Sequence, residues 1–395
     1  MYVRRLFLIV FVLFITLPAR SATVLVLRFH NESQFSDLNW VGESIAETLM
    51  DEFGAANQIV LDRESRAEGL RRLSLRSNAG FTKATLIRLG QTLDADYLCY
   101  GTYDAHLLNG SSQLKDSSIQ LSAHFIDLRK MRDGPDYSEA GPLSELSRLE
   151  EHLAWQSLKY LSPKTPFQLN QFMAAPKLVR EDAEESYIRG LLSSTKEQQQ
   201  KWFAQALALD SHFTSAAFEL AKLALDRKEY RQATALFAHI SPEDPRYPEA
   251  RFKMGLSAYG IEDFAAAATY FREVAKTFPL SEVYNNLGAA ENHLNLPAAI
   301  DDFRRALDAD ENDSTYLFNL ATALLKNNYF EEAAKRFQAV LDRDPEDSEA
   351  RALLERALHR QAVAPDAKTL SPERLKKNFD ETAFRQLKAM LQPKS

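Results

Sequence analysis

The sequence predicts an α/β domain with a mixed sheet, followed by an all-α solenoid built from repeats. Three observations indicate this fold class and domain organisation. Short apolar runs rich in β-branched residues alternate with helical patterns over residues 23–160. Residues 181–363 are self-similar with a period of 33 or 34 residues. A separate apolar stretch stands at the start of the chain, before the first domain.

Residues 1–22 have the pattern of a secretory signal peptide. Two arginines precede the apolar run LFLIVFVLFITL (6–17), and small residues follow it. A helix of that length spans only about 18 Å, less than the ~30 Å of a hydrocarbon core. We therefore expect cleavage after Ser21 or Ala22, and an uncleaved anchor is the alternative.

Charge and cysteine content narrow the class of partner. The net charge is −7, and loss of the arginine-containing leader makes the remainder more acidic, which argues against nucleic acid and anionic membranes. The only cysteine, Cys99, cannot form an internal disulfide or a lipoprotein anchor, and its apolar run predicts a buried, inert thiol. No other stretch is long enough to cross a membrane, so we expect an exported, periplasmic protein.

The first domain is expected to contain both strands and helices. TVLVLRF is a continuous apolar run typical of a strand buried on both faces, and IQLSAHFID alternates between apolar and polar residues. Strands are predicted at 23–29, 58–63, 95–103, 119–127 and near 137–141. A helix capped by Asp37 or Asn39 carries Val41, Ile45, Leu49 and Phe53 on one face. Further helices are predicted at 64–75, 82–92 and 143–160.

The repeats in the second half pair small residues with large ones. Four units occupy 214–247, 248–280, 281–313 and 314–347, with a degenerate unit at 184–213 and a capping helix at 348–363. Small residues on the first helix of each unit face small residues on the second: Ala221, Gly255, Gly288 and Ala321 against Ala233, Ala267, Ala299 and Ala333. This pattern lets paired helices approach closely, while large apolar residues fill the space to the next unit.

The period and this pattern resemble the tetratricopeptide repeat (TPR), a helix–turn–helix unit. The resemblance implies a concave groove that binds protein partners, lined by Phe218, Lys222, Phe252, Tyr259, Asn285, Asn286, Asn292, Phe318, Asn319 and Lys326. Asn286 and Asn319 are equivalent positions, where asparagines in this family hold the backbone of an extended peptide. Glu219 and Lys253 replace asparagine in the two preceding units, so the ladder is partial. A hydrated groove surface is the alternative.

The first domain also resembles a family. Phe29, Asn31 and Ser33 end a strand, Trp40 and Gly42 open a helix, and LGQTLDADYLCYG (89–101) follows. This set is similar to the amino-terminal domain of TolB, and to curli-secretion (CsgG-like) and flagellar outer-membrane-associated proteins. The resemblance covers residues 23–160 and implies the domain type, because the β-propeller that follows in TolB is absent here.

One polar cluster between the first strand and the first helix is a candidate contact loop. His30, Asn31, Glu32 and Ser33 lie at an expected sheet edge, where ligands often bind. The chain carries no HExxH, GxSxG or phosphate-binding glycine motif, and its histidines lack metal-ligand spacing. DADENDS (308–314) begins like a calcium loop but has Asp313 where the turn glycine belongs. We expect no catalytic residues, no cofactor and no metal.

The C-terminal residues 364–395 are predicted to be helical. In LSPERL, Ser371 is placed to cap a helix with Pro372 at its first position. A second helix begins after Asp380, with Phe379 packing on Phe384 and an apolar stripe formed by Phe384, Leu387, Met390 and Leu391. A helix this short is marginal alone. We therefore predict that it docks on the α/β domain or along the repeats.

These features together predict an exported, non-enzymatic scaffold. The α/β domain is joined through a linker (161–180) to a solenoid that binds an envelope protein. Two alternatives remain open at this point. One is an assembly factor for an outer-membrane or surface machine. The other is a ligand-sensing or hydrolytic domain that uses the loop from His30 to Asp37, with the repeats as a targeting arm.

Deletion of residues 366–395 should lower both the melting temperature and the solubility of the chain. The deletion would expose to water the apolar surface that the docked stripe covers. Thermal unfolding followed by circular dichroism, together with soluble yield, measures the effect. Unchanged values would show that the segment does not dock.

Overall fold

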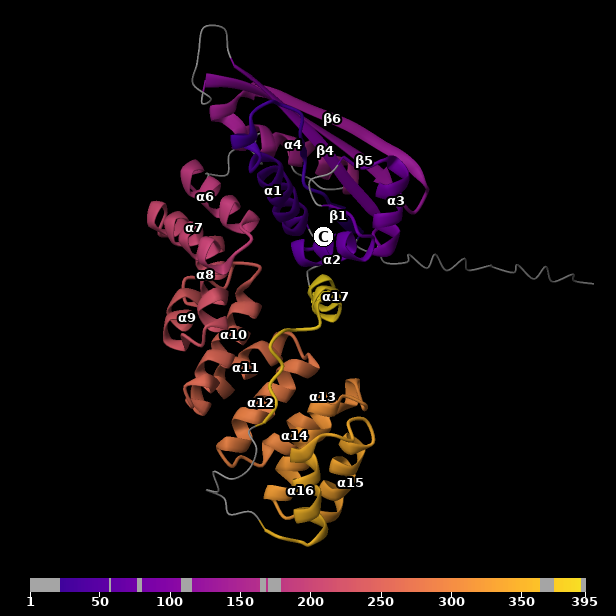
Figure 1. Cartoon of the computed structure of the whole chain (residues 1–395), viewed down its shortest axis with the longest axis vertical. Coiled ribbons are helices and arrows are strands. Elements are labelled where there is room, and N and C mark those ends of the chain that lie inside the picture. Colours follow the sequence, from indigo (N-terminus) through magenta and orange to yellow (C-terminus); the bar gives the residue numbers. More distant parts are fainter. Residues whose placement is uncertain are drawn as a thin grey trace, which may run out of the picture.

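The computed structural model of the chain describes residues 22–56, 58–76, 80–107, 116–163, 168–169, 179–362 and 373–391. The predicted leader and most of the predicted linker lie outside these residues. Figure 1 shows a sheet with flanking helices at one end of the molecule and a long series of paired helices extending from it. The predicted order of an α/β domain followed by an all-α solenoid is confirmed.

The sheet is mixed, as predicted. Its strands are β1 (Thr23–Val26), β2 (His30–Asn31), β3 (Ile59–Val60), β4 (Tyr97–Leu107), β5 (Ser117–Asp127) and β6 (Arg132–Pro142). The order is β3-β1-β4-β5-β6, and β2 pairs with the far half of β4. β1 is parallel to β3 and β4, whereas β4, β5 and β6 form an antiparallel meander.

The strands differ in length from the expectation, β3 and β6 the most, and β1 ends at Val26 instead of at residue 29. β3 has two residues, whereas the sequence predicts an extended stretch over 58–63. β6 has 11 residues and pairs along β5 from Pro142 to Arg132, whereas the sequence predicts only 137–141. Its sequence RDGPDYSEAGP is poor in β-forming residues, and an edge strand tolerates proline because one side of its backbone needs no partner.

Helices cover both faces of the sheet. Val24, Val26 and Cys99 face a core shared with α1 (Val41–Ala55) and α4 (Leu146–Leu161). Leu25 and Leu27 face a second core shared with α2 (Arg63–Arg72) and α3 (Lys83–Thr92). The alternation explains why TVLVLRF is apolar at nearly every position. Cys99 is buried and free, and burial raises the pKa of its thiol.

A backbone hydrogen bond holds the start of α1 in place, and the prediction that Asp37 or Asn39 caps this helix is wrong. Trp40 is the N-cap residue, and its side chain makes no capping bond. Asp37 lies in a 3₁₀ turn (Ser36–Leu38), and the Asn39 side chain accepts a hydrogen bond from Asn31. Instead, the N–H of Phe29 donates to the carbonyl of Gly42 over 3.0 Å, which ties the helix to the end of β1.

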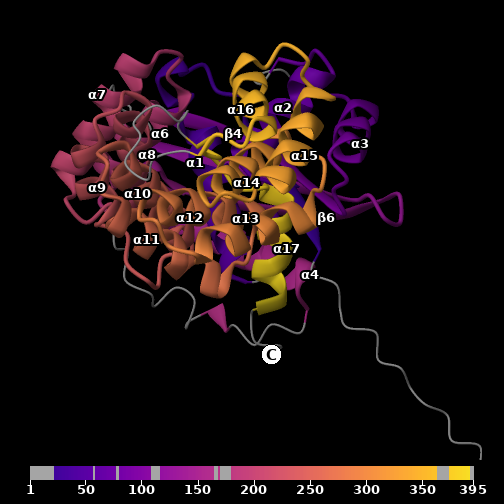
Figure 2. The ribbon, with the colours of Figure 1, turned by 90° about the horizontal axis from the view of Figure 1, so that it is seen from below.

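The solenoid consists of helix pairs with close internal packing. Its helices are α6 (Glu181–Leu192), α7 (Lys196–Leu209), α8 (Thr214–Asp226), α9 (Tyr230–Phe237), α10 (Tyr247–Gly260), α11 (Phe264–Thr277), α12 (Ser281–His293), α13 (Ala298–Ala309), α14 (Ser314–Lys326), α15 (Phe330–Leu341) and the cap α16 (Ser348–Leu358). A Cβ at Gly255 would lie 2.6 Å from the Phe271 ring, and one at Gly288 3.0 Å from the Phe303 ring. The series does not run straight: in Figure 2, which looks along it, α7 lies at the left and α16 near the middle.

The C-terminal segment lies along the repeats. Residues 373–380 are extended and α17 (Glu381–Leu391) follows, running back toward the α/β domain in Figure 1. Ser371 and Pro372 lie outside the described residues, and the helix expected to continue through Leu375 is wrong. The second helix is confirmed: the Asp380 carboxylate accepts from the N–H of Ala383 over 2.8 Å.

Substitution of Gly42 by alanine should destabilise the α/β domain by about 1–3 kcal/mol, the usual cost of overpacking. A Cβ there would lie 2.0 Å from the carbonyl oxygen of Phe29. Gly54 lies in the same helix, and a Cβ there would meet no atom within 4 Å, so Gly54→Ala is the matched control. The control should gain about 0.5–1 kcal/mol. Urea unfolding measures both, and equal effects would contradict the role given to Gly42.

Candidate functional site

The concave side of the solenoid is a groove filled by the chain's own C-terminal segment. The first helices α10, α12 and α14 present Lys253, Asn286 and Asn319 at equivalent positions of successive repeats. Residues 373–379 pass over these side chains in extended form, from the C-terminal repeats toward the N-terminal ones. Both asparagines are fully buried beneath the segment.

Two asparagines bind the backbone of the segment in the same way. Asn319 donates to the carbonyl of Arg374 and accepts from its N–H, each over 2.8 Å. Asn286 donates to the carbonyl of Lys376 over 2.8 Å and accepts from its N–H over 2.9 Å. One amide satisfies both backbone groups of a residue because it carries a donor and an acceptor. The two asparagines therefore recognise the extended backbone of the segment and not its side chains.

A third asparagine holds these two in orientation. Asn285 accepts from Asn319 over 2.8 Å and donates to Asn286 over 3.1 Å, so the three amides form one connected network. It also donates to the carbonyl of Arg374 over 3.0 Å. With every amide partnered, the buried polar network carries little desolvation penalty.

Lys253 is the next contact along the ladder. Its ammonium group donates to the carbonyl of Lys377 over 2.9 Å and to the Asn378 side chain over 2.6 Å. Burial lowers the pKa of Lys253, although nearby Glu249 opposes the shift. The three equivalent positions therefore bind residues 374, 376 and 377–378 in turn, and an extended chain covers two residues in about 7 Å.

The first residue of the segment occupies a polar pocket. The Glu373 carboxylate accepts from Asn292 over 2.6 Å and from the Tyr259 hydroxyl over 2.9 Å, and it lies 2.7 Å from the His293 imidazole. Burial works against its ionisation, but the hydrogen bonds from His293 and Asn292 and the charge of His293 hold the pKa of Glu373 below its usual value. The pocket thus accepts a carboxylate. Lys326 closes it by donating to the Asn292 carbonyl.

The basic side chains of the segment meet acidic and aromatic residues. Arg374 forms a two-point ion pair with Asp347 at 2.7 and 3.0 Å, and its guanidinium lies 3.6 Å from the centre of the Phe318 ring. The Arg374 hydrogen bond lowers the pKa of Asp347. Lys376 lies 2.6 Å from Asp313 and over the Tyr316 ring.

Apolar contacts anchor the segment between and beyond these charges. Leu375 packs between the cores of adjacent repeats. The ring centre of Phe379 lies 4.5 Å from that of Phe252, and the centre of Phe384 on α17 lies 4.8 Å from that of Phe278. Phe379 and Phe384 stack on each other at 5.1 Å, as the sequence predicted.

The structure brings together most of the predicted groove residues. Those that touch the segment are Phe252, Tyr259, Asn285, Asn286, Asn292, Phe318 and Asn319. Lys326 supports the Glu373 pocket, whereas Phe218 and Lys222 line a cavity that adjoins the groove at Lys253. Sequence reasoning missed His293, Asp313 and Asp347. Charge complementarity could have pointed to the two aspartates, because the segment is basic and acidic residues recur in the inter-repeat turns.

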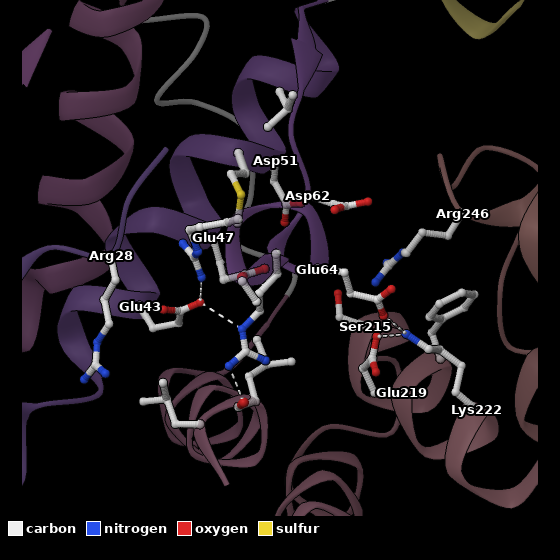
Figure 3. Close-up of a pocket in the computed structure, with 18 of the residues that line it drawn as sticks. Arg28, Glu43, Glu47, Asp51, Asp62, Glu64, Ser215, Glu219, Lys222 and Arg246 are labelled. Atoms are coloured by element: carbon white, nitrogen blue, oxygen red, sulfur yellow. Dashed lines mark hydrogen bonds and ion pairs between the residues drawn. The ribbon is translucent and has the colours of Figure 1, made fainter. Parts of the chain in front are cut away.

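The adjoining cavity lies between the α/β domain and the first repeats. It has a volume of about 1030 Å³ and is lined by charged residues of both signs from α1, α2, α8 and α10 (Figure 3). The buried Glu43 carboxylate lies 3.1 Å from Arg63 and also pairs with Arg66. Arg63 in turn donates to the carbonyl of Leu191 on α6, which ties the two domains together.

Glu47 lines the same cavity. Its Oε1 is buried without a hydrogen-bond partner among the described residues. Burial, together with the negative charges of Glu43 and Asp51, raises the pKa of Glu47 to about 8. In the described part of the chain no group of three or more histidine, cysteine or acidic residues is arranged to hold a metal ion.

The candidate contact loop is organised by its own side chains. Asn31 donates to the Phe35 carbonyl over 3.0 Å and accepts from the N–H and hydroxyl of Ser33 over 2.9 and 2.7 Å. His30 and Glu32 are exposed, and β2 attaches the loop to β4. Trp40 packs against the α/β core and against the first core of the solenoid. Asn31 and Ser33 thus serve to shape the loop.

Comparison with known proteins identifies the repeats. Two family models, both described as tetratricopeptide repeat, match residues 252–314 and 295–357, which confirms the predicted repeat type there. Neither match extends into residues 23–160, so the TolB-like resemblance stays a prediction. No curated protein sequence matches the chain. Within the described residues, no helix combines the length and apolar character needed to cross a membrane.

Two solved structures with similar helices have low identity to this chain. YrrB, described as a TPR protein with an unusual peptide-binding site, is 19% identical, with a TM-score of 0.39 over 45% of this chain and 91% of that chain. MamA from Desulfovibrio magneticus RS-1 is 18% identical, with a TM-score of 0.39 over 43% of this chain and 99% of that chain.

Substitution of Glu47 by glutamine should reduce the loss of stability as pH rises. The folded chain retains a proton on Glu47 that the unfolded chain releases above its usual pKa of 4.5, so this group destabilises the fold progressively between pH 4.5 and about 8. Urea unfolding of both proteins across this range measures the difference. Glu197→Gln, at an exposed position on α7, is the control and should follow the unsubstituted chain. Parallel profiles for all three would contradict the raised pKa.

Proposed function

We propose that this protein is an exported, non-enzymatic adaptor that binds an envelope protein by holding an extended segment of it in the TPR groove. The observation that carries the proposal is the pairing of Asn286 and Asn319 with both backbone groups of a residue in the extended segment. A site that binds backbone and excludes water suits recognition of a polypeptide and offers no group positioned to act on it chemically.

Export and an envelope partner are supported by the sequence. The basic start, short apolar run and small residues of 1–22 favour secretion, and the single cysteine is buried and therefore unavailable for lipid attachment. The TolB-like and CsgG-like resemblance of 23–160 adds a second surface for the same class of partner. An assembly role in an outer-membrane or surface machine would use the same groove. A hydrolytic role for the loop from His30 to Asp37 gains no support, because Asn31 and Ser33 bond to each other and to the loop backbone.

Crosslinking in intact cells of the source organism tests the proposal. The chain should be recovered from the envelope fraction with an N-terminus at Ala22 or Thr23, crosslinked to a partner through the groove. The same two amides hold the chain's own Arg374 and Lys376, so the comparison is made in a chain whose segment is weakened by Arg374→Ala and Phe379→Ala. In that chain, Asn286→Ala combined with Asn319→Ala should reduce the crosslinked product at least tenfold, because each lost amide leaves two backbone groups of a bound segment unpaired, at about 1–3 kcal/mol.

Asn312→Ala is the matched control, since Asn312 lies in an exposed inter-repeat turn. The predicted groove also offers alanine substitutions at Phe252 and Phe318, but the asparagine variants are the better test. Both rings are fully buried, and their loss would cost about 3–5 kcal/mol of stability and obscure a binding effect. An undiminished crosslinked product in the double asparagine variant would contradict recognition through the groove.

A further inference from the structure

We propose that residues 373–391 are an internal ligand of the groove, and that the partner presents an extended segment with the same order of side chains. That order is an acidic residue, an arginine, an apolar residue and a lysine, with an aromatic residue three positions later. The inference rests on the proposed function, since it assumes that the groove binds a polypeptide. The inference specifies which side chains the bound polypeptide has, and it states that the partner must displace residues 373–391.

The register follows from the pockets along the groove. Glu373 enters the pocket of Asn292, Tyr259 and His293, which supplies donors to a carboxylate. Next to it, Asp347 and Glu349 receive Arg374, and farther along Asp313 receives Lys376. A segment shifted by one residue would place a basic group in the carboxylate pocket. Electrostatics therefore fixes which segments bind and in which direction they run.

The apolar positions add a second requirement. Leu375 reaches the junction of two repeat cores, and Phe379 covers the buried ring of Phe252. The intervening Lys377 is exposed, so its side chain is free to vary in a ligand. Lys253 binds the carbonyl at that position and the Asn378 side-chain oxygen, which favours an acceptor just before the aromatic residue.

Attachment to the same chain makes the internal segment a competitor. Residues 363–372 alone connect it to the end of the solenoid that follows α16. A short connection gives an effective concentration in the millimolar range. For an internal segment with an intrinsic Kd of about 10 μM, any external segment would then bind about 100-fold more weakly to the intact chain than to an open groove.

Displacement can be measured on the full chain. The probe is a fluorescein-labelled synthetic peptide with the sequence of residues 371–391, and fluorescence anisotropy reports its binding. In Arg374→Ala/Phe379→Ala the internal segment loses the ion pairs of Arg374 with Asp347 and Glu349 and the contact of the Phe379 ring with Phe252, while every groove residue is kept. We expect this variant to bind the peptide at least tenfold more tightly than the unsubstituted chain. Lys377→Ala changes an exposed residue of the same segment and should bind like the unsubstituted chain.

The outcomes separate the two proposals. Equal binding by the unsubstituted chain and by Arg374→Ala/Phe379→Ala would overturn the internal ligand but leave the groove as a peptide site. No binding to the opened variant would overturn the proposed function itself. Circular dichroism checks that the variant is folded. Arg374→Glu is the second variant, because it repels Asp347 and Glu349 while every apolar residue of the segment is kept, and it should also bind more tightly.

Substituted peptides test the side-chain order on the opened chain. Reversal of charge at the positions of Glu373 or Arg374 in the peptide should weaken binding at least tenfold, and alanine at the position of Phe379 should weaken it severalfold. Substitution at the position of Lys377 should have no effect. A scrambled peptide that binds equally well would overturn the proposed register.

Discussion

The close approach of the two helices in each repeat is the constraint on which the groove depends. Gly255 and Gly288 leave room for Phe271 and Phe303 directly against the first helix. This contact sets how the two helices of each of these pairs pack, and the stacked pairs then place equivalent residues at a constant spacing. The asparagine amides of α12 and α14 match an extended chain for that reason. A side chain added at either glycine would disturb the ladder as well as the core.

Filling of the groove follows from the burial of its polar groups. Asn285, Asn286 and Asn319 are completely buried with the segment over them, and all three amides find partners. Without a segment, water would have to meet the same amides beside the apolar rings of Phe252 and Phe318. Buried polar groups need hydrogen-bond partners, and exposed aromatic rings favour burial. A polypeptide supplies backbone groups for the amides and apolar side chains for the rings, so it suits this groove.

The sequence predicted features that depend on local pattern and missed those that depend on distant partners. The repeat period and the equivalence of Asn286 with Asn319 follow from spacing alone. The extended form of residues 373–378 does not, because PERL favours the start of a helix until asparagines some 55 to 90 residues away bind its backbone. The length of β6 could not be predicted from its own sequence either, because pairing with β5 overrides a sequence rich in glycine, proline and aspartate.

Lys253 connects the groove with the cavity at the domain junction. It lies 3.9 Å from Glu249, and both residues line the cavity together with Phe379 of the segment. The same ammonium group that binds Lys377 and Asn378 thus faces carboxylates at the junction. Departure of the segment would remove two acceptors from a buried cation and leave Glu249 as its nearby counter-charge. Occupancy of the groove and the charge balance at the junction are therefore physically linked through this one residue.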